Sequence, residues 1–411
     1  MSSQRTPPIP IDNARDMLLD SIIPIEEVEV ISLDQAYGRI AGETLLSKVD
    51  LPSTQNAAVD GYGVHSDSLL KDPDQAFKIV GIARAGHPFD GVIDKDEAIE
   101  IYTGGVMPMG PDCVAMHEDC SRDGNKIRVL ATLSKGSNMR PPGENLAKGE
   151  TLISKGQMIT AALIGQLAAS GTAQLPVSRR IRVAILSTGD EVVAAGNSAT
   201  SGQIFDANRP MLKAMLQHNH IDLIDCGIVP DNKDALADAY EQALQGADVV
   251  ISSGGASDGI EDHTQNAMLQ IGAECVFWRL AMKPGRPMAV GRRGKELIFC
   301  LPGNPVAAFV CTRLLILPLL GRACGGAWQP ALKIGVPAGF THRKKPGRAE
   351  FLRVVLENNG GKQQLVLHGR KGAGVISSLT GADGLVEIPL DNAGVELGTV
   401  LNFLPFHERG L

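Results

Sequence analysis

The segment DVVISSGGASDGIEDHTQNAMLQIG, residues 248–272, joins an apolar run to a loop of glycines and acidic residues, and then to a stretch with helical periodicity. The apolar run is short and rich in β-branched residues, which is typical of a buried strand. The segment therefore predicts a strand, a loop and a helix, the repeating unit of an α/β fold.

The same unit recurs between residues 180 and 329. Strands are expected at residues 182–188, 221–229, 248–254, 287–291 and 297–303. Helices are expected at residues 208–217, 232–244, 263–272 and 304–317, the last with Asn304 as N-cap and Pro305 at its first position. This alternation predicts a parallel sheet covered by helices on both faces.

The flanking regions differ in character. Helices are predicted at residues 11–23, with Asp12 as N-cap, at 32–46 and at 160–170. Residues 50–148 carry short strand patterns separated by Gly and Pro, which indicates a β-rich insertion, and strand patterns return after residue 330. The fold class is therefore a multi-domain α/β protein with a β-rich insertion and a C-terminal β domain.

Composition narrows the function classes. The chain has 411 residues, of which 44% are hydrophobic and 4% aromatic, and its net charge is −7, unlike a general nucleic-acid binder. The N-terminus has no apolar signal segment. The longest apolar stretch, residues 306–320, is too short for a membrane span and carries Arg313, so it predicts a buried core helix. We expect neither a nucleic-acid nor a membrane partner.

Cysteine usage indicates a reducing compartment. The Cys number seven and form no C-x-x-C pair, so we expect buried free thiols and a cytoplasmic location. The segments His117-Glu-Asp-Cys120 and His218-Asn-His220 have no second ligand pair at metal-site spacing, and we interpret both as turns.

Charged side chains follow the predicted strands. Ligands of open α/β sheets bind where parallel strands end, so these side chains should converge on one edge. Clustered carboxylates favour a cation such as Mg²⁺, and Ser-Gly-Gly stretches offer backbone N–H groups to phosphate. The acids that follow strands are Asp190, Glu191, Asp231, Asp258, Glu261 and Asp262, and the cations Lys283 and Arg286 come just before the strand at 287–291. They predict a Mg²⁺-assisted reaction on a phosphorylated ligand, although each acid alone is typical of a solvated loop.

Residues 255–259 also spell G-x-S-x-G, the nucleophile elbow of serine hydrolases, with Ser257 as the nucleophile. The acidic residues around Ser257 would oppose an oxyanion, and no HGGG-like segment is present. The loop therefore favours metal and phosphate binding over a hydrolase triad. The chain also has no P-loop pattern.

Three glycine loops of the insertion carry polar side chains. Asp60 precedes Gly61, Thr103 precedes two glycines, and Arg140 and Glu144 flank a Pro-Pro-Gly turn. Each loop alone is typical of a tight turn.

Taken together, these segments resemble the molybdopterin molybdenumtransferase (MoeA) family, to which the enzymatic part of gephyrin also belongs. The matching stretches are GRIAGETL, NAAVDGYGV, IYTGGVMP, NMRPPGEN, VAILSTGDE, GQIFDANR, ISSGGASDGIEDH, FWRLAMKPGRP, LPGNPVA and PGRAEFLRV. They run in order along nearly the whole chain. The resemblance implies an N-terminal helix (1–28), a discontinuous linker domain (29–49 and 149–179), the insertion (50–148), a molybdopterin-binding α/β domain (180–329) and a C-terminal β domain (330–411).

The resemblance also implies an activity. The enzymes of this family accept adenylylated molybdopterin and molybdate, cleave the pyrophosphate bond with the help of Mg²⁺, release AMP and leave molybdenum on the dithiolene. They are homodimers whose site lies between the α/β domain of one subunit and the insertion of the other. Transient contacts with other molybdenum cofactor biosynthesis proteins are expected.

Site residues follow from the matching motifs. The resemblance implies catalytic roles for Asp60, Thr103, Glu191, Asp231, Asp262 and Lys283, with Glu191, Asp231 and Asp262 as metal ligands. It implies substrate binding by Ser253, Gly254, Gly255, Ser257, Arg279, Pro284, Arg286, Arg348, Arg353, Ser377 and Ser378.

The chain departs from the family pattern at five positions. Asn145 stands where Asp is usual and Arg279 where Lys is common, while Ala57, Val59 and Asp258 replace a Ser, a Met and an apolar residue. These changes leave open a weakened paralogue that only binds molybdopterin or acts as a scaffold, and a tungstate-specific variant. A third alternative, the preceding adenylylation step, is disfavoured by the extra β domains.

Overall fold

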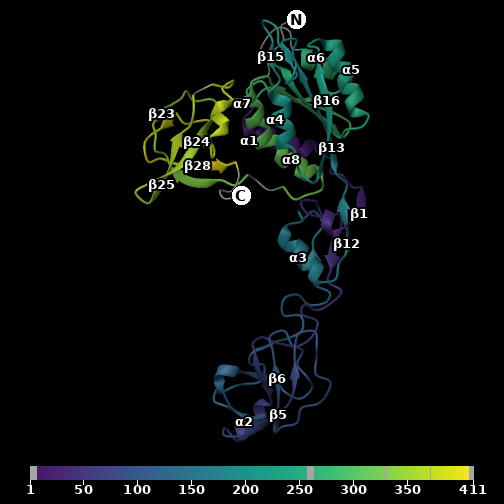
Figure 1. Cartoon of the computed structure of the whole chain (residues 1–411). Helices are drawn as coiled ribbons and strands as arrows, with labels where there is room; N and C mark the ends of the chain where they lie inside the picture. Colours follow the sequence, from purple (N-terminus) through teal and green to yellow (C-terminus); the bar gives the residue numbers. More distant parts are fainter. Residues whose placement is uncertain (1–6, 257–262, 329–330, 371, 407–411) are drawn as a thin grey trace.

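The computed structural model describes residues 7–256, 263–328, 331–370 and 372–406. The chain is elongated, with the α/β domain and the C-terminal β domain near each other at one end and the β-rich insertion at the other (Figure 1). A small linker domain, formed by two separate chain segments, lies between the two ends.

The α/β domain is built on a six-stranded sheet in the order β16-β13-β17-β21-β20-β18. Its main elements are β13 (Ile181–Thr188), α4 (Asn208–Met215), β16 (Ile221–Val229), α5 (Lys233–Leu244), β17 (Val249–Ala256), α6 (His263–Gln270), β18 (Glu274–Phe277), β20 (Ala289–Arg293), β21 (Glu296–Pro302), α7 (Pro305–Cys311) and α8 (Leu317–Ala323), with the short strands β14 (Val192–Val193) and β15 (Ile204–Phe205). The helices predicted for this region are confirmed.

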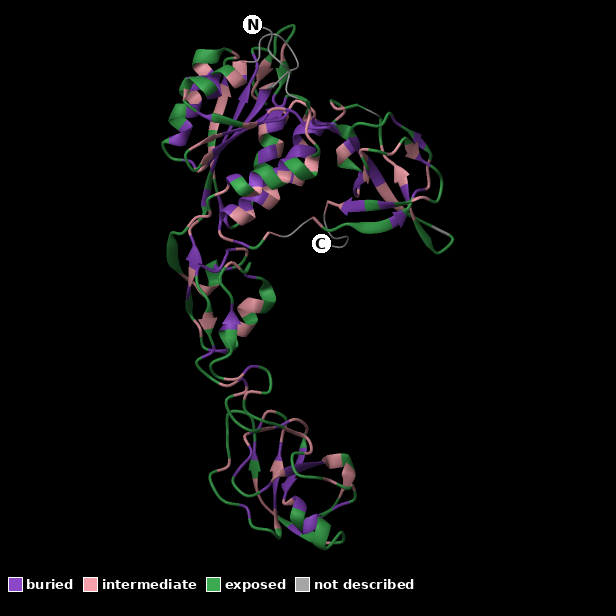
Figure 2. Ribbon diagram, turned by 180° about the vertical axis from the view of Figure 1, so that it is seen from behind, coloured by how far each residue is buried: buried purple, intermediate pink, exposed green. Residues whose placement is uncertain are grey.

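Both faces of this sheet are covered, as the burial colours of Figure 2 show. Alternate side chains of β13 serve the two faces, because successive residues of a strand point in opposite directions. Val183 and Ile185 pack with α4, α7, α8 and the N-terminal helix α1 (Ile11–Ser21). Ala184 and Leu186 pack with α5 and α6.

The sheet is mixed, and the prediction that it is parallel throughout is wrong. β16, β13, β17 and β21 are parallel, whereas β20 runs antiparallel to β21 and β18. Only Gly294 and Lys295 separate β20 from β21, and Gly294 has a φ of +62°. A two-residue connection can join only antiparallel strands, so this turn sets the direction of β20.

Residues 32–46 do not form the predicted helix. They contain a 3₁₀ turn (Leu33–Gln35) and the short strand β2 (Leu45–Leu46). Gly38 has a φ of +71°, which is outside the helical region, and a Cβ on Gly42 would lie 2.8 Å from Val28 Cγ1.

The N-cap of α1 is also not Asp12 but Pro10, while Asp12 forms an ion pair with Arg15 instead.

The linker domain connects the two ends of the molecule. Its elements are β1 (Val28–Ser32), β2, β11 (Thr151–Ile153), α3 (Ala161–Ala169) and β12 (Gln174–Ser178), so the helix predicted at 160–170 is confirmed. β1 pairs with β12 and β2 with β11. The chain leaves this domain near residue 50 and returns near residue 148, where Leu51 N–H donates to Leu146 O (2.8 Å) and Leu146 N–H to Leu51 O (3.3 Å).

The insertion folds around a sheet in the order β7-β4-β6-β5-β9-β8. Its elements are β3 (Asn56–Ala57), β4 (Gly61–Val64), α2 (Ser66–Lys71), β5 (Ala76–Ala83), β6 (Glu97–Ile101), β7 (Cys113–Met116), β8 (Cys120–Asp123), β9 (Lys126–Val129) and β10 (Met139–Arg140). The insertion has two apolar clusters of its own, so it is stabilised independently of the α/β core.

The C-terminal β domain also contains a mixed sheet, in the order β19-β24-β26-β28-β22, with β25 paired to β24. Its elements are β22 (Ile334–Pro337), β23 (His342–Arg343), β24 (Ala349–Asn359), β25 (Lys362–Leu367), α9 (Ser377–Thr380), β26 (Gly384–Ile388), β27 (Gly394–Val395) and β28 (Val400–Pro405). One strand of this sheet, β19 (Met282–Lys283), comes from the α/β part of the chain. Phe351 and Leu404 also join the α/β core cluster, so the two domains pack directly together.

Among the described residues, one helical run, Pro305–Ala323, has the length and apolarity of a membrane span, and 61% of its most apolar window is buried inside the protein. A core helix meets the same criteria, and the prediction of a buried helix here is confirmed. All seven Cys are free thiols, as expected, but only four are buried: Cys120 and Cys226 are half-buried and Cys275 is exposed.

Candidate functional site

The candidate site lies where β13, β16, β17 and β21 end. Thr188 is the last residue of β13, and Asp231 follows β16 by two residues. A Cβ built on Gly254, near the end of β17, would lie 2.0 Å from Thr188 O, and the Cα of Gly254 is 3.7 Å from the position of a Cβ on Gly303, just after β21. Four consecutive strand ends therefore meet at this edge, as predicted.

Asp231 is half-buried at this edge, whereas Asp190 and Glu191 are exposed. Asp231 Oδ1 accepts a hydrogen bond from Thr188 Oγ1 (3.4 Å), and the backbone N–H of Asp231 donates to Asp190 Oδ1 (3.1 Å). Burial raises the pKa of Asp231, and Asp190 and Glu191 also raise it, while His263 and Thr188 oppose the rise. Such crowding of negative charge favours a bound cation.

The glycines of β17 are required by their surroundings. Gly254 has a φ of +102° and Gly255 a φ of +67°. A Cβ on Gly255 would lie 2.6 Å from Thr264 Oγ1 and 3.4 Å from Asp231 Oδ1. The protein's own atoms fill both Cβ positions, so these glycines let the end of β17 pack closely against Thr188 and Asp231.

Asn208 was not among the predicted site residues, yet its side chain links the ends of two strands at this edge. Its Nδ2 donates to Ser253 Oγ (2.6 Å) and to Gly303 O (2.8 Å). The side chain of Ser253 is therefore buried and engaged by Asn208. The buried Oδ1 of Asn208 and Oγ1 of Thr264 have no hydrogen-bond partner in the described part of the chain. Asn208 stands in the GQIFDANR motif at the start of α4, which is the signal that could have identified it.

The antiparallel direction of β20 brings the basic residues to the same edge. Ala289, the first residue of β20, pairs with Cys300 near the end of β21. β20 therefore starts at the edge where the parallel strands end, and residues 279–288, which lead into it, lie at that edge. In this segment Arg279 and Pro284 are buried, Arg286 is half-buried and Lys283 is exposed. Lys283 Nζ donates to Glu350 Oε1 (3.1 Å) in the C-terminal domain.

The C-terminal domain adds a second group of polar residues. Arg353 Nε donates to Ser378 Oγ (3.0 Å), both side chains are buried, and burial lowers the pKa of Arg353. Arg348 and Ser377 are exposed. The loop before α9 reaches the α/β domain, because Val306 N–H donates to Ala373 O (3.0 Å) and a Cβ on Gly374 would lie 3.5 Å from Asn304 Oδ1. Asn304 is the N-cap of α7 as predicted, although its side chain makes no capping hydrogen bond.

The insertion brings two predicted catalytic residues together. Asp60 Oδ1 accepts hydrogen bonds from both the backbone N–H and the hydroxyl of Thr103, each at 2.7 Å. The backbone hydrogen bond, followed by the hydroxyl one, lowers the pKa of Asp60. Arg140 Nε donates to Glu144 Oε2 (2.7 Å), and Asn145 is exposed.

The two halves of the predicted site are far apart within one chain. Asp60 and Thr103 border β4 and β6 in the insertion, whereas Asp231 and Lys283 lie at the opposite end, beyond the linker domain (Figure 1). Ser257, Asp258, Glu261 and Asp262 lie outside the described residues, so their roles stay predictions. No cluster of three His, Cys, Asp or Glu at metal-binding distance occurs within the ranges that the structure describes.

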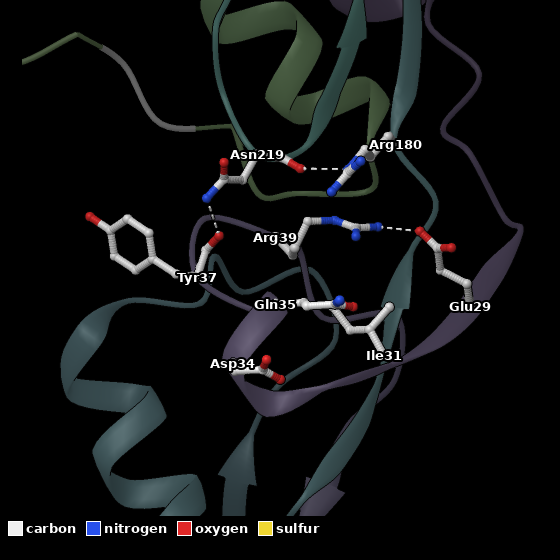
Figure 3. A pocket seen from close by; sticks show the side chains of 8 residues that line it. All are labelled: Glu29, Ile31, Asp34, Gln35, Tyr37, Arg39, Arg180 and Asn219. Atoms are coloured by element: carbon white, nitrogen blue, oxygen red, sulfur yellow. Dashed lines mark hydrogen bonds and ion pairs between the residues drawn. The ribbon is translucent and has the colours of Figure 1, made fainter.

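A cavity of about 480 Å³ lies at another place, between the linker and α/β domains (Figure 3). Arg39 in its wall donates to Ser178 O (2.8 Å) and to Glu29, and Arg180 Nε donates to Asn219 O (3.1 Å). Its eight lining residues include none of the predicted site residues.

His117–Asp119 form a 3₁₀ turn, as predicted, while His220 is buried and its ring bonds Gly38 O (3.2 Å).

Comparison with known proteins covers the whole architecture. Three family models match: the MoeA N-terminal region (domain I and II) at residues 9–171, the probable molybdopterin binding domain at 184–322, and the MoeA C-terminal region (domain IV) at 336–406. A molybdopterin molybdenumtransferase of Haemophilus influenzae is 31% identical, over 97% of this chain and 98% of that protein. One from Nostoc sp. is 33% identical, over 79% of this chain and 78% of that protein.

A solved structure of the molybdopterin biosynthesis MoeA protein from Pyrococcus horikoshii matches with a TM-score of 0.84 at 26% identity. The match covers 97% of this chain and all of that one. The predicted multi-domain α/β class is therefore confirmed.

Proposed function

The chain belongs to the molybdopterin molybdenumtransferase family, and from that premise we propose that it transfers molybdenum from molybdate to adenylylated molybdopterin, cleaving the pyrophosphate bond and releasing AMP. The observation that carries the proposal is the edge at Asp231. There, the tightly packed glycines of β17, a half-buried carboxylate and the basic segment 279–288 meet at four strand ends. Phosphoanhydride cleavage mainly requires this kind of charge neutralisation and positioning.

Different site residues bind different groups of the substrates. The backbone at Gly254 and Gly255, where the pairing of β17 with β21 is interrupted, provides the surface for the pterin and its phosphates. Lys283 and Arg286 hold molybdate or a phosphate, and Arg353 with Ser378 forms a further oxyanion contact. Asp60, kept ionised by Thr103, completes the site from the insertion.

The donor set at this edge fits Mg²⁺. Mg²⁺ is usually held by one or two carboxylates together with substrate phosphates, and Glu191 and Asp231 offer two. Burial, with smaller contributions from Asp190 and Glu191, raises the pKa of Asp231, and such an ion would favour its ionised form. When bound, the cation supplies positive charge to the phosphate oxygens.

The distance between the two halves of the site supports a homodimer in which each site is shared. In that arrangement the insertion of one subunit covers the strand ends of the other. A cytoplasmic location and transient contacts with other molybdenum cofactor biosynthesis proteins belong to the same proposal, because substrate and product would pass between enzymes.

The test is AMP release by the purified protein from adenylylated molybdopterin with Mg²⁺, with and without molybdate. We expect molybdate-dependent AMP release together with activation of an apo-molybdoenzyme, and loss of both in Asp231→Asn. Tungstate in a parallel arm separates the tungstate-specific variant. Binding of the substrate without AMP release in either arm would replace the transferase with a scaffold role.

A further inference from the structure

The C-terminal domain supplies a partner to the basic segment at the site edge. Residues Met282 and Lys283 leave the α/β domain and form β19, which pairs with β24 of the C-terminal sheet. In this register Lys283 is directly opposite Glu350. The lysine that we assign to anion binding is therefore anchored on a different domain from the strand ends.

Glu350 is fixed at both carboxylate oxygens. Its Oε1 accepts from Lys283 Nζ (3.1 Å), and its Oε2 lies 2.7 Å from His342 Nε2. The side chains of Glu350 and His342 are 10% and 7% exposed, whereas that of Lys283 is 61% exposed. The buried carboxylate of Glu350 is thus held by His342 on one side and contacts the exposed ammonium of Lys283 on the other.

The ammonium keeps capacity for a ligand. A lysine has three N–H donors, and its one hydrogen bond among the described residues is the one to Glu350. Lys344 is different, because the residue is buried and its Nζ donates to Arg348 O (2.9 Å) and Leu390 O (3.1 Å). Lys283 is thus arranged for an external anion, and Lys344 for holding the loop.

We propose that Glu350, held by His342, is a positioning residue that fixes the Lys283 ammonium at the site edge, so that the C-terminal domain sets the strength of oxyanion binding. The inference rests on the proposed function for the identity of the anion. It requires no new chemistry, since Glu350 acts through Lys283. Restricting the long lysine side chain before the anion arrives reduces the entropy lost on binding.

The charged surroundings of Glu350 are consistent with this role. Burial alone would raise the pKa of Glu350, but the hydrogen bonds from His342 and Lys283 outweigh burial and lower it. Lys344 also faces Glu350, and Asp391 and Arg348 lie around Lys344. Glu350 is thus ionised at neutral pH and can hold the Lys283 ammonium as an ion pair.

The first experiment labels lysine amines of the full-length protein with a limiting acylating reagent at fixed pH, and measures each site by mass spectrometry. An amine held in an ion pair is less available to the reagent than one that has been released. We expect Glu350→Gln to raise the labelling of Lys283 about two- to fivefold, a modest effect because the side chain is exposed. Glu387→Gln is the matched control, since Glu387 pairs with Lys333 in the same domain (2.7 Å) and should change labelling of Lys333 but not of Lys283.

The second experiment measures AMP release as a function of molybdate concentration. Glu350→Gln and His342→Gln should each raise KM for molybdate several-fold with kcat nearly unchanged, because the ammonium loses its fixed place. A merely structural role would instead lower the melting temperature and the active fraction with KM unaltered, and that result would overturn the proposal. A lowered KM would likewise overturn it, by showing that Glu350 repels the anion.

The two experiments fail separately. Without molybdate-dependent AMP release by the unaltered protein, the proposed function fails, but the labelling experiment still reports on the coupling of Glu350 to Lys283. Unchanged Lys283 labelling in Glu350→Gln contradicts the positioning role even in a fully active enzyme.

Discussion

Asp60 and Thr103 are 43 residues apart in the sequence, and one oxygen of the Asp60 carboxylate accepts both the backbone N–H and the hydroxyl of Thr103. Each bond stabilises the ionised carboxylate, so the pKa of Asp60 is lowered. The pair presents a fixed negative charge on the surface of the insertion.

Thr103→Val should remove the hydroxyl bond and keep the backbone bond. We expect the pKa of Asp60 to rise part of the way to its ordinary value, and the acid limb of the pH–activity profile to move to higher pH. Carboxyl NMR titration and AMP release measure the two effects. Thr132→Val, at an exposed position of the insertion, is the control and should change neither.

Mixing two inactive variants should restore activity if the site is shared between subunits. Asp60→Asn removes the insertion half and Asp231→Asn the α/β half, so a mixed dimer has one intact site and one site with both defects. Random exchange should recover about a quarter of the unaltered activity. Recovery near zero after verified subunit exchange would place both residues in the site of a single chain.

Gly254→Ala should disrupt the site edge. The new Cβ would lie 2.0 Å from Thr188 O at a φ of +102°, so the strand ends must separate. We expect a loss of at least about 3 kcal/mol in the free energy of unfolding, together with loss of AMP release. Denaturant unfolding tests this prediction, and Gly246→Ala, where a Cβ meets nothing within 4 Å, should be tolerated.

His220 should make the protein sensitive to acid. Burial lowers its pKa to about 4 from an ordinary 6.5, so the neutral ring is favoured in the folded state. The stabilisation is complete above pH 6.5 and is lost as pH falls through about 4, and it amounts to about 3 kcal/mol. His220→Gln, which can still donate to Gly38 O, should show a flatter loss of stability between these pH values in thermal unfolding.

Much of the α/β domain was predictable because its signals are local. Apolar runs and helix starts such as Asn304-Pro305 depend on neighbouring residues, and they appear where expected. The direction of β20 was not predicted, although the two-residue turn at Gly294 sets it. The alternation of strand and helix patterns does not show whether two neighbouring strands are parallel or antiparallel. The helix predicted at residues 32–46 fails at Gly38 and Gly42, whose roles depend on contacts with Asn219 and Val28.

The site was predictable where single motifs supply it. Asp231 follows a strand that the sequence itself marks, and Gly254 lies near the end of another. The partner of Lys283, Glu350, comes from 67 residues further along the chain, and His342, which holds Glu350, is likewise distant in sequence from the strands of the α/β domain. The distance between the insertion and the strand ends could not be predicted from local sequence patterns either, because it depends on how the linker domain orients its two chain segments.

The adjacent crossing points at Leu51 and Leu146 make the insertion a cassette. Its two ends are already joined across the linker by Ser47 N–H to Glu150 O (2.8 Å) and Gly149 N–H to Ser47 O (2.8 Å). Excision with a short turn in its place would leave the remaining chain topology unchanged. Grafting the cassette from a relative would exchange one half of the catalytic apparatus as a unit, so this boundary is a natural site for building chimaeras.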